Sequence, residues 1–445
     1  MTMTTSTEQA DVCVVGLGYV GLTLATAFAV AGLRVAGVER NPSVVAEIAA
    51  GRSPFHETGL DDAVTKVVAS GLLTAVGLDA PLPPAAAYVI TVGTPVRDGQ
   101  VFLGDLESAV RRVATDMPDG ALVVLRSTVR VGTTNGIAAE VLRESGTSFS
   151  LAMAPERTIE GKALAELSSL PQIVGGIDER STELAAALFG RLGVEIVRVE
   201  SAEAAELAKL ASNTYRDLQF AYANELAYLA DTIGIDVFDV ITACNHGYER
   251  MNVAKPGPVA GPCLEKDAYI LANSAELHGT HAPLVMTARR TNEAITEHVV
   301  TMVADLPTPD RVAILGLAFK GRPETSDVRG SMARDFADAV VQRWSGTSVV
   351  GWDPLVSVED AASLGVTFGD AADVIAGSPL IIVQTNHPTF GTPEFARLLI
   401  EHAPSGAVIV DLWNQLDAAA HEHPELTVRA FGRMNAAVVR VVEAV

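Results

Sequence analysis

A cysteine past the middle of the chain ends a segment whose composition favours a rigid loop. Residues 255–263 are rich in glycine and proline and end at Cys263, and Lys266 and Asp267 follow closely. Glycine and proline interrupt helices and strands, so we expect residues 255–262 to form a loop and a helix to begin at or just after the cysteine. Helix N-termini and neighbouring cations such as Lys266 stabilise a thiolate. We interpret Cys263 as a nucleophile; the alternative is a core cysteine beside a turn.

A second group of polar residues recurs at three- and four-residue spacing within residues 201–233, which have the pattern of one long helix. The residues of this stripe are Glu206, Lys209, Asn213, Arg216, Asp217 and Asn224. Asparagine is a poor helix former, and lysine is scarce, with only six in the chain. Such a stripe can hold water and stabilise an oxyanion. A solvated helix face would give the same pattern.

Two carboxylates lie close together after an apolar approach. Glu156 and Glu160 are four residues apart in sequence, and Arg157 lies between them. Paired carboxylates can act as general acid and base. A capped helix start fits the same residues, so the sequence leaves both interpretations open.

A glycine-rich turn follows the first apolar run of the chain. Gly16, Gly18 and Gly21 have the spacing of a dinucleotide-binding turn, and an alanine-rich helical stretch follows them. Gly16 permits the tight turn, Gly18 lets the backbone approach a pyrophosphate, and Gly21 lets helix and strand pack closely. The helix N-terminus then favours the anionic pyrophosphate. A glycine turn without a ligand is the alternative.

An acidic residue ends the next apolar run, where an adenosine ribose would lie. Glu39 would accept hydrogen bonds from the ribose hydroxyls and repel the 2′-phosphate of NADP. This pattern favours NAD, although Arg40 beside it weakens the exclusion of NADP.

These residues require a scaffold in which strands alternate with helices. Apolar runs suited to strands occur at residues 12–15, 35–38, 88–92, 122–125 and 173–174, and again, after a proline-containing breaker, at 312–315, 349–351, 380–383 and 408–410. Alternation with helical patterns predicts parallel sheets covered on both faces. We therefore predict an α/β fold with two Rossmann-like, doubly wound lobes joined by a long central helical segment.

Composition and charge narrow the functional class. The 445 residues are 49% hydrophobic, and 54 acidic residues against 32 basic ones give a net charge of −22. This charge repels a phosphate backbone, so we expect no nucleic-acid partner. Three cysteines far apart, no signal-peptide pattern and no run of 18 apolar residues predict a cytoplasmic protein without a membrane segment. We assign no metal site.

In their order along the chain, these motifs resemble those of the nucleotide-sugar 6-dehydrogenases, which comprise UDP-glucose, GDP-mannose and UDP-N-acetylhexosamine dehydrogenases. The resemblance covers nearly the whole length. The matching segments are residues 16–21, 51–57, 92–95, 127–133, 155–161, 206–213, 224–225, 255–267, 316–320, 327–329 and 353–354.

The resemblance implies an NAD-dependent four-electron oxidation of a sugar C6 alcohol to a uronic acid, used in polysaccharide biosynthesis. Cys263 would form a thiohemiacetal and then a thioester, which water hydrolyses. The catalytic residues implied are Cys263, Lys209, Asn213, Asp267, Glu156, Glu160 and Thr128. The cofactor-binding residues implied are Gly16, Gly18, Tyr19, Val20, Gly21, Glu39, Arg40, Thr94, Thr128, Lys266 and Arg329. The substrate-binding residues implied are Glu156, Arg157, Lys209, Asn213, Arg250, Gly261, Arg289, Phe319 and Lys320.

The resemblance also implies a domain organisation and an assembly. Residues 1–200 would form the NAD-binding Rossmann domain, and residues 201–305 a central helical domain that carries the catalytic loop and dimerises. Residues 306–445 would form an α/β domain that binds a UDP-sugar. We therefore expect a homodimer whose partner subunit can complete the active site.

The sequence departs from the family pattern at two places. Ala260-Gly261 stands where the family usually has two glycines before the cysteine. Gly330 and Met332 replace a glutamate and a proline on the cofactor side.

Residues 245–252, with Arg250, and residues 262–267 look closest to the UDP-N-acetylhexosamine branch, which acts on N-acetylmannosamine or N-acetylglucosamine derivatives. UDP-glucose stays open, because Lys266 and Asp267 also resemble that branch. Two further alternatives are a two-electron dehydrogenase of the hydroxyacid type, which needs no thiol, and a non-catalytic NAD-binding protein.

Overall fold

The computed structural model describes residues 9–79 and 81–434. The chain divides into two compact units. The first contains the residues up to Ser212 together with Tyr269–His281, and the second contains Asn213–Ala268 and the residues from Ala282 onward. Helices α8 (Ala202–Ile233) and α10 (Leu264–Leu277) therefore contribute residues to both units.

The first unit is built on an eight-stranded sheet in the order β10-β9-β8-β7-β4-β1-β2-β3. Its strands are β1 (Ala10–Val15), β2 (Val35–Glu39), β3 (Leu73–Gly77), β4 (Ala85–Ile90), β7 (Ala121–Leu125), β8 (Phe149–Met153), β9 (Gln172–Gly176) and β10 (Ile196–Arg198). The helices are α1 (Tyr19–Val30), α2 (Pro42–Ala49), α3 (Leu60–Ala69), α4 (Gly104–Asp116), α5 (Ala139–Glu144), preceded by a π-helical turn (Thr134–Ala138), α6 (Ala163–Leu167) and α7 (Glu179–Gly190). A hairpin of β5 (Val96–Arg97) and β6 (Gln100–Val101) completes the unit.

Both faces of this sheet are covered by helices. Val12 and Val14 of β1 pack in one core with α1, α3 and α7, whereas Cys13 and Val15 pack in another with α4 and α5. Successive side chains of a strand point to opposite faces, so a strand covered on both sides is apolar throughout. The predicted doubly wound arrangement is confirmed for this unit.

One strand pair departs from the predicted parallel sheet. β8 and β9 pair antiparallel, with Ala152 opposite Gly176 and Met153 opposite Gly175. The predicted parallel sheet is therefore interrupted at this one pair. A strand buried on both faces gives the same apolar run in either direction, so the pattern does not reveal its orientation.

The second unit contains a six-stranded sheet in the order β13-β12-β11-β14-β15-β16, and all its neighbouring strands are parallel. The strands are β11 (Arg311–Leu315), β12 (Ser348–Trp352), β13 (Thr367–Phe368), β14 (Leu380–Val383), β15 (Ala407–Asp411) and β16 (Leu426–Ala430). The helices other than α8 and α10 are α9 (Val237–Asn245), α11 (Pro283–Glu293), α12 (Ile295–Met302), α13 (Ala333–Arg343), α14 (Val358–Ala362), α15 (Ala371–Ile375), α16 (Pro393–His402) and α17 (Ala418–Glu422).

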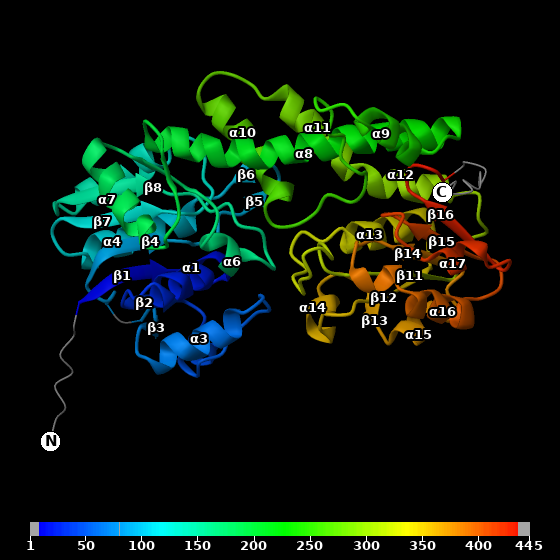
Figure 1. Ribbon diagram of the computed structural model, residues 1–445, viewed down its shortest axis with the longest axis horizontal. Helices are drawn as coiled ribbons and strands as arrows, with labels where there is room; N and C mark the ends of the chain where they lie inside the picture. Colours follow the sequence, from blue (N-terminus) through cyan, green and yellow to red (C-terminus); the bar gives the residue numbers. More distant parts are fainter. Residues whose placement is uncertain (1–8, 80, 435–445) are drawn as a thin grey trace. The chain divides into compact units, whose positions relative to one another are not determined.

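This sheet is also packed on both faces. Val312 and Ile314 of β11 lie in a core with α12 and α13, whereas Ala313 and Leu315 lie in a core with α15 and α16. The two sets of helices lie on opposite sides of the strands (Figure 1). The second predicted doubly wound lobe is therefore confirmed.

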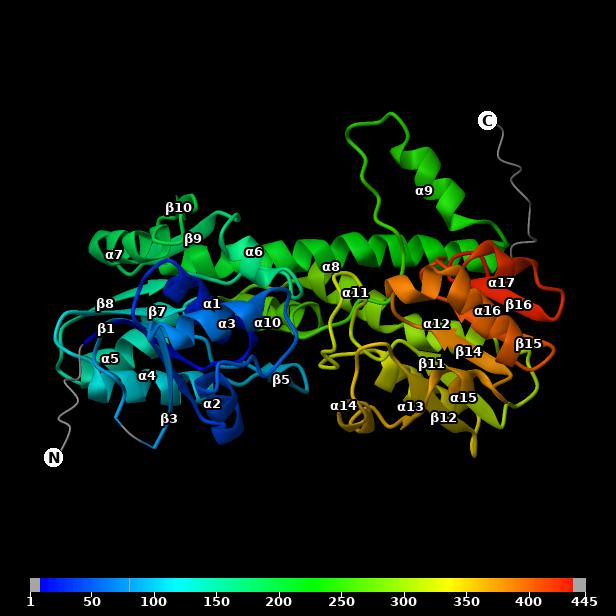
Figure 2. The same ribbon diagram turned by 60° about the horizontal axis from the view of Figure 1, so that its bottom comes forward.

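The predicted long helix over residues 201–233 is α8. Figure 2 shows α9 and the irregular segment after it extending away from α8 before the chain returns to α10. α10 begins at Leu264, directly after Cys263. The predicted helix start next to the cysteine is confirmed.

Among the described residues, no helix combines the length and apolar character that crossing a membrane would require.

Candidate active site

The glycine turn of the first unit has the geometry that a bound pyrophosphate needs. Gly16 has a φ of 95°. A Cβ atom at Gly21 would lie only 1.8 Å from the Gly16 carbonyl oxygen, so glycine is required there. At Gly18 a Cβ would meet nothing within 4 Å, and no side chain caps the N-terminus of α1. The turn therefore leaves open space beside the N–H groups of Tyr19 and Val20, and these residues fit the pyrophosphate of NAD.

Glu39 lies beside this turn at the end of β2. Its Oε2 accepts a hydrogen bond from the N–H of Leu17 at 2.8 Å, and its Oε1 accepts one from Asn41 at 3.0 Å. The carboxylate is thereby fixed next to the cofactor turn, with remaining lone pairs for ribose hydroxyls. Arg40 instead forms an exposed ion pair with Asp105 at 3.4 Å.

The loops after β4 and β7 are tied together. The Oγ1 of Thr94 donates to the carbonyl of Thr128 at 2.6 Å, and the Oγ of Ser127 donates to the carbonyl of Val92 at 2.6 Å. β1, β4 and β7 are parallel neighbours, so these loops and the glycine turn share the edge at which α/β sheets bind ligands.

Glu156 lies in a buried ion pair that the sequence did not predict. Its Oε2 accepts from Nη2 of Arg126 at 2.5 Å, and its Oε1 accepts from the N–H groups of Arg157 and Thr158 at 2.7 and 2.8 Å. Burial raises the pKa of Glu156, but the Arg126 charge and these hydrogen bonds outweigh it, with a smaller contribution from Lys209, so the pKa is lowered. Glu156 is therefore held as a carboxylate.

The alternative of a capped helix start at Glu156 is wrong, because the next helix, α6, begins only at Ala163. Arg157 donates from its side chain to the carbonyl of Pro171. Glu160 is half-buried and precedes Gly161, whose N–H donates to the hydroxyl of Tyr19 at 2.7 Å. Sequence reasoning missed Arg126; its one signal was a basic residue that ends an otherwise apolar strand.

The polar stripe of α8 is buried. Glu206, Lys209, Asn213, Asp217 and Asn224 are all at most 8% exposed, and only Arg216 of the stripe is exposed. The interpretation of the stripe as a solvated helix face was therefore wrong. Lys209 and Asn213 are one turn apart on the helix, with Lys209 in the first unit and Asn213 in the second.

Within the first unit, Glu206 holds the segment that follows Thr128. Its carboxylate accepts from the N–H of Gly132 at 2.6 Å and from the N–H and hydroxyl of Thr134 at 2.8 and 2.6 Å. Burial raises the pKa of Glu206 to about 7, against the opposing effect of these hydrogen bonds.

Within the second unit, Cys263 is an exposed residue at the start of α10. Its carbonyl accepts from the N–H groups of Lys266 and Asp267 at 3.3 and 3.0 Å, which makes the first turn of the helix. The Oδ2 of buried Asp267 accepts from the Nδ2 of Asn213 at 2.6 Å. The structure thus brings Asn213 and Asp267 together one turn from the thiol. By contrast, Cys13 is fully buried.

The predicted substrate residue Phe319 packs against the cysteine loop at Gly261. Gly261 has a φ of 100°, and a Cβ there would lie 2.4 Å from the ring of Phe319. Nζ of Lys320 lies 5.1 Å from the centroid of that ring. The loop therefore keeps glycine at a position where a side chain has no room. The alanine at the preceding position is consistent with that geometry.

The second departure from the family pattern also has a local explanation. A Cβ at Gly330 would lie 2.0 Å from Oε2 of Glu265, so the carboxylate of Glu265 fills the space where a side chain at 330 would begin. Arg329 beside it is exposed and paired with Asp327 at 2.6 Å. Arg250 lies over the ring of Tyr248, with its Cζ 4.8 Å from the ring centroid.

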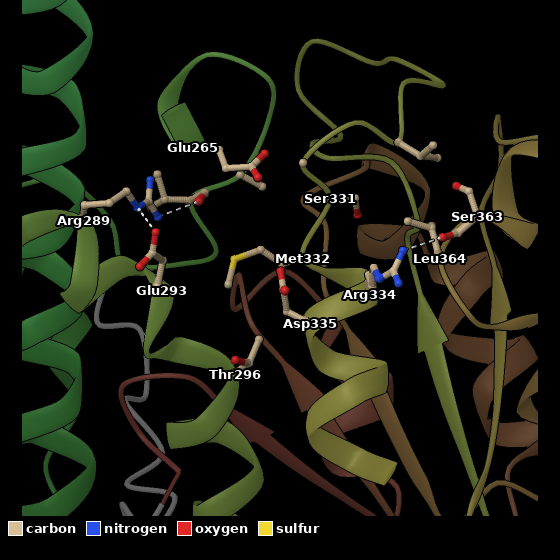
Figure 3. Close-up of a pocket in the computed structure, with 14 residues that line it drawn as sticks. Glu265, Arg289, Glu293, Thr296, Ser331, Met332, Arg334, Asp335, Ser363 and Leu364 are labelled. Atoms are coloured by element: carbon tan, nitrogen blue, oxygen red, sulfur yellow. Dashed lines mark hydrogen bonds and ion pairs between the residues drawn. The ribbon is translucent and has the colours of Figure 1, made fainter. Parts of the chain in front are cut away.

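A pocket of about 600 Å³ lies behind the cysteine loop in the second unit (Figure 3). Arg289 and Glu293 of α11 lie on one side of it, and Arg334 and Asp335 of α13 lie on the other. Arg289 was predicted to contact the substrate; in the structure its buried guanidinium donates to protein groups described below.

Comparison with protein-family models places three consecutive domains on the chain. Residues 10–193 match the NAD-binding domain of the UDP-glucose/GDP-mannose dehydrogenase family, residues 203–294 its central domain, and residues 313–418 its UDP-binding domain. The chain belongs to this family. It is accordingly an NAD-dependent nucleotide-sugar dehydrogenase, as the resemblance predicted.

Curated relatives are similar over most of their length. The chain is 34% identical to the UDP-N-acetyl-D-mannosamine dehydrogenase of Pyrococcus horikoshii over 393 residues, covering 85% of this chain and 90% of the relative. It is 32% identical to the NDP-N-acetyl-D-galactosaminuronic acid dehydrogenase of Ralstonia nicotianae over 403 residues, covering 87% of this chain and 93% of the relative.

Solved structures of the family superimpose closely. A UDP-D-ManNAc dehydrogenase from Pyrococcus horikoshii gives a TM-score of 0.83 at 30% identity and covers 96% of this chain and 100% of its own. A UDP-glucose dehydrogenase from Pyrobaculum islandicum gives 0.82 at 29% identity, with 96% and 99% covered. Because these two scores are nearly equal, the fold does not discriminate between N-acetylated and simple UDP-sugars.

Proposed function

We propose that this enzyme oxidises the C6 alcohol of a UDP-N-acetylhexosamine to the carboxylate, with UDP-N-acetylmannosamine or UDP-N-acetylglucosamine as substrate. The observation that carries the proposal is the exposed thiol of Cys263 at a helix N-terminus, with the paired Asn213 and Asp267 in the next turn. A two-electron dehydrogenase needs no such thiol.

In the proposed reaction, one alcohol, two NAD and one water give one carboxylate, two NADH and three protons. NAD, when bound at the glycine turn, accepts the hydride in each of the two oxidations. Lys209 and Asn213 polarise the C6 oxygen. The Cys263 thiolate adds to the aldehyde carbon and retains it as a thiohemiacetal, whose oxidation gives a thioester.

Hydrolysis of that thioester requires an oriented water molecule. Asp267, held by Asn213, is the group we assign to accept its proton. Glu156, Glu160 and Thr128 are assigned to ordering the water. The lowered pKa of Glu156 suits a hydrogen-bond acceptor rather than a proton donor.

The choice of an N-acetylated sugar is supported by the names of the curated relatives, which include UDP-N-acetyl-D-mannosamine and NDP-N-acetyl-D-galactosaminuronic acid dehydrogenases. UDP-glucose is the second candidate, because the fold matches the UDP-glucose dehydrogenase of Pyrobaculum islandicum as well as it matches the UDP-D-ManNAc dehydrogenase. We assign the nucleotide to residues 313–418, in keeping with the UDP-binding domain model.

The deciding experiment is turnover with UDP-N-acetylmannosamine, UDP-N-acetylglucosamine, UDP-N-acetylgalactosamine, UDP-glucose and GDP-mannose. We expect two NADH per sugar consumed and a uronic acid product from UDP-N-acetylmannosamine or UDP-N-acetylglucosamine. One NADH with an aldehyde product would refute the reaction, and preferred use of UDP-glucose would refute the substrate assignment.

A matched variant tests the nucleophile. Cys263→Ser should retain NAD binding, measured by fluorescence titration, and stall before the carboxylate forms. The control is Cys244→Ser. Cys244 is a half-buried residue of α9, and this variant should keep full turnover. Uronate production by Cys263→Ser at the wild-type rate would contradict the assigned role.

We also propose that the enzyme is a homodimer formed through α8. Tyr215, Tyr222 and Leu229 recur every seven residues on α8 and are 62%, 55% and 57% exposed. A stripe with this period suits packing against a second copy of the same helix. Tyr222→Asp should shift the mass measured by light scattering to that of a monomer, whereas Val358→Asp, at an exposed apolar residue of α14, should not. A wild-type monomer would refute the proposal.

A further inference from the structure

One buried side chain, that of Arg289, hydrogen-bonds the main chain on both sides of Cys263. Arg289 of α11 is 2% exposed. Its Nη1 donates to the carbonyl of Leu264 at 3.0 Å, and its Nη2 donates to the carbonyl of Val259 at 3.3 Å. The two carbonyls lie on either side of Cys263 in sequence. The planar guanidinium, with donors in a fixed fork, spans them in a way that a single ammonium group does not.

Arg289 is in turn fixed by residues of α8 and α11. Its Nη1 lies 2.9 Å from Oδ1 of Asp217, and both side chains are 2% exposed. Nδ2 of Asn292 donates to the same Oδ1 at 2.8 Å and to the carbonyl of Asp217 at 2.9 Å. A buried ion pair needs such additional hydrogen bonds to offset its desolvation, and they also fix its geometry.

The network continues to a third point on the loop. Nδ2 of Asn224 donates to Oδ1 of Asn292 at 2.9 Å and to the carbonyl of Gly257 at 3.1 Å. Oδ1 of Asn224 accepts from the N–H of Gly257 at 2.8 Å. Arg289 and Asn224 therefore bond the main chain at residues 257, 259 and 264, and buried Asp217 and Asn292 hold these two side chains in place.

We propose that Arg289 is a positioning residue for the Cys263 thiol, in place of the substrate contact that the family resemblance implied. By fixing the carbonyls of Val259 and Leu264, it keeps Cys263 at the N-terminus of α10, where a thiolate is stabilised. The proposal rests on the proposed role of Cys263 as the nucleophile. It predicts an effect on the thiol in the absence of any substrate.

The test compares Arg289→Lys, which keeps the charge and loses the fork, with the wild-type enzyme. The readout is the rate of Cys263 alkylation by iodoacetamide from pH 6 to pH 9, without NAD or sugar nucleotide, followed by mass spectrometry. Loss of the helix N-terminal setting should slow alkylation at pH 7 by about two- to fivefold and displace the pH profile upward. With substrate present, kcat should fall while KM stays within about twofold of the wild-type value.

Arg290→Lys is the matched control. Arg290 is the exposed neighbour on the same helix, and its Nη2 donates to Thr287 of its own helix. It should leave the alkylation profile unchanged. Asp217→Asn, which weakens the anchor of Arg289 without touching the loop, should change the profile in the same direction as Arg289→Lys. It also carries the test if Arg289→Lys fails to fold.

Two results would overturn the proposal. The first is a wild-type alkylation profile in Arg289→Lys with a raised KM, which would make Arg289 a substrate contact. The second is a wild-type profile in the folded Asp217→Asn variant. Failure of the proposed function is separate, because it would show as absent NADH production by the wild-type enzyme, whereas the alkylation profiles need no turnover.

Discussion

Protonation of Glu206 should make the first compact unit more stable at acidic pH than at alkaline pH. Its buried carboxylate accepts hydrogen bonds from Gly132 and Thr134 but still has a pKa raised to about 7 by burial. The folded state therefore binds this proton more tightly than the unfolded state does. Folding takes up a proton between pH 4.5 and about 7, so stability falls as the pH rises through that window.

The difference between the ordinary value of 4.5 and about 7 corresponds to about 3 kcal/mol of unfolding free energy. Urea unfolding of the full-length wild type and Glu206→Gln at pH 5 and pH 8 measures it. The wild type should lose about 2.5 kcal/mol more than the variant between these pH values, because glutamine does not titrate.

Glu203→Gln provides the control for this experiment. Glu203 lies one turn earlier on α8, and although burial raises its pKa, the hydrogen bond from Asn135 and other donors outweigh it, so the pKa is lowered. Its contribution to stability is therefore lost as the pH falls, opposite in sign to that of Glu206. The quantity compared is the unfolding free energy of the wild type minus that of Glu206→Gln. If this difference is the same at pH 5 and pH 8, or is larger at pH 8, the reasoning is refuted.

Gly18→Ala should fold normally and bind NAD more weakly in a fluorescence titration, whereas Gly21→Ala should also lower the unfolding temperature, because its Cβ would lie 1.8 Å from a carbonyl oxygen; equal unfolding temperatures would contradict this. Cys263 should be alkylated first and Cys13 last in a mass-spectrometric time course, since burial raises the pKa of Cys13 to about 12. Earlier labelling of Cys13 than of Cys263 in the folded enzyme would contradict the buried position of Cys13 in β1. Arg126→Met should destabilise the enzyme by about 3–5 kcal/mol in urea unfolding, because it strands a buried carboxylate; a change below about 1 kcal/mol would show that the pair is dispensable.

The sequence predicted those features that leave a periodic or local mark. The 3.6-residue pattern predicted α8, and the glycine- and proline-rich loop predicted a helix start beside Cys263. The glycine turn after β1 was predicted from the spacing of three glycines, of which Gly16 has a positive φ and Gly21 has no room for a side chain.

Features that depend on tertiary contacts left no such mark. Arg126 and Glu156 are 30 residues apart and meet because they follow neighbouring strands, β7 and β8. The sequence pattern of the α8 stripe also fits a solvated face, but in the structure Glu206 bonds residues 132–134 in the first unit, and Asp217 and Asn224 bond α11 and the cysteine loop in the second. Asn224 hydrogen-bonds the loop at Gly257, and Asp217 anchors Arg289, which in turn bonds the loop.

The hydrogen bonds that Arg289 and Asn224 make to the loop and to the first residue of α10 go to main-chain atoms: the N–H and carbonyl of Gly257 and the carbonyls of Val259 and Leu264. Every residue type carries a main-chain carbonyl, so these hydrogen bonds do not depend on the side chains at positions 258, 260 and 262. The network therefore fixes the path of the main chain around Cys263 without depending on the side chain of Ala260, whereas Pro258 and Pro262 add to the rigidity of the loop.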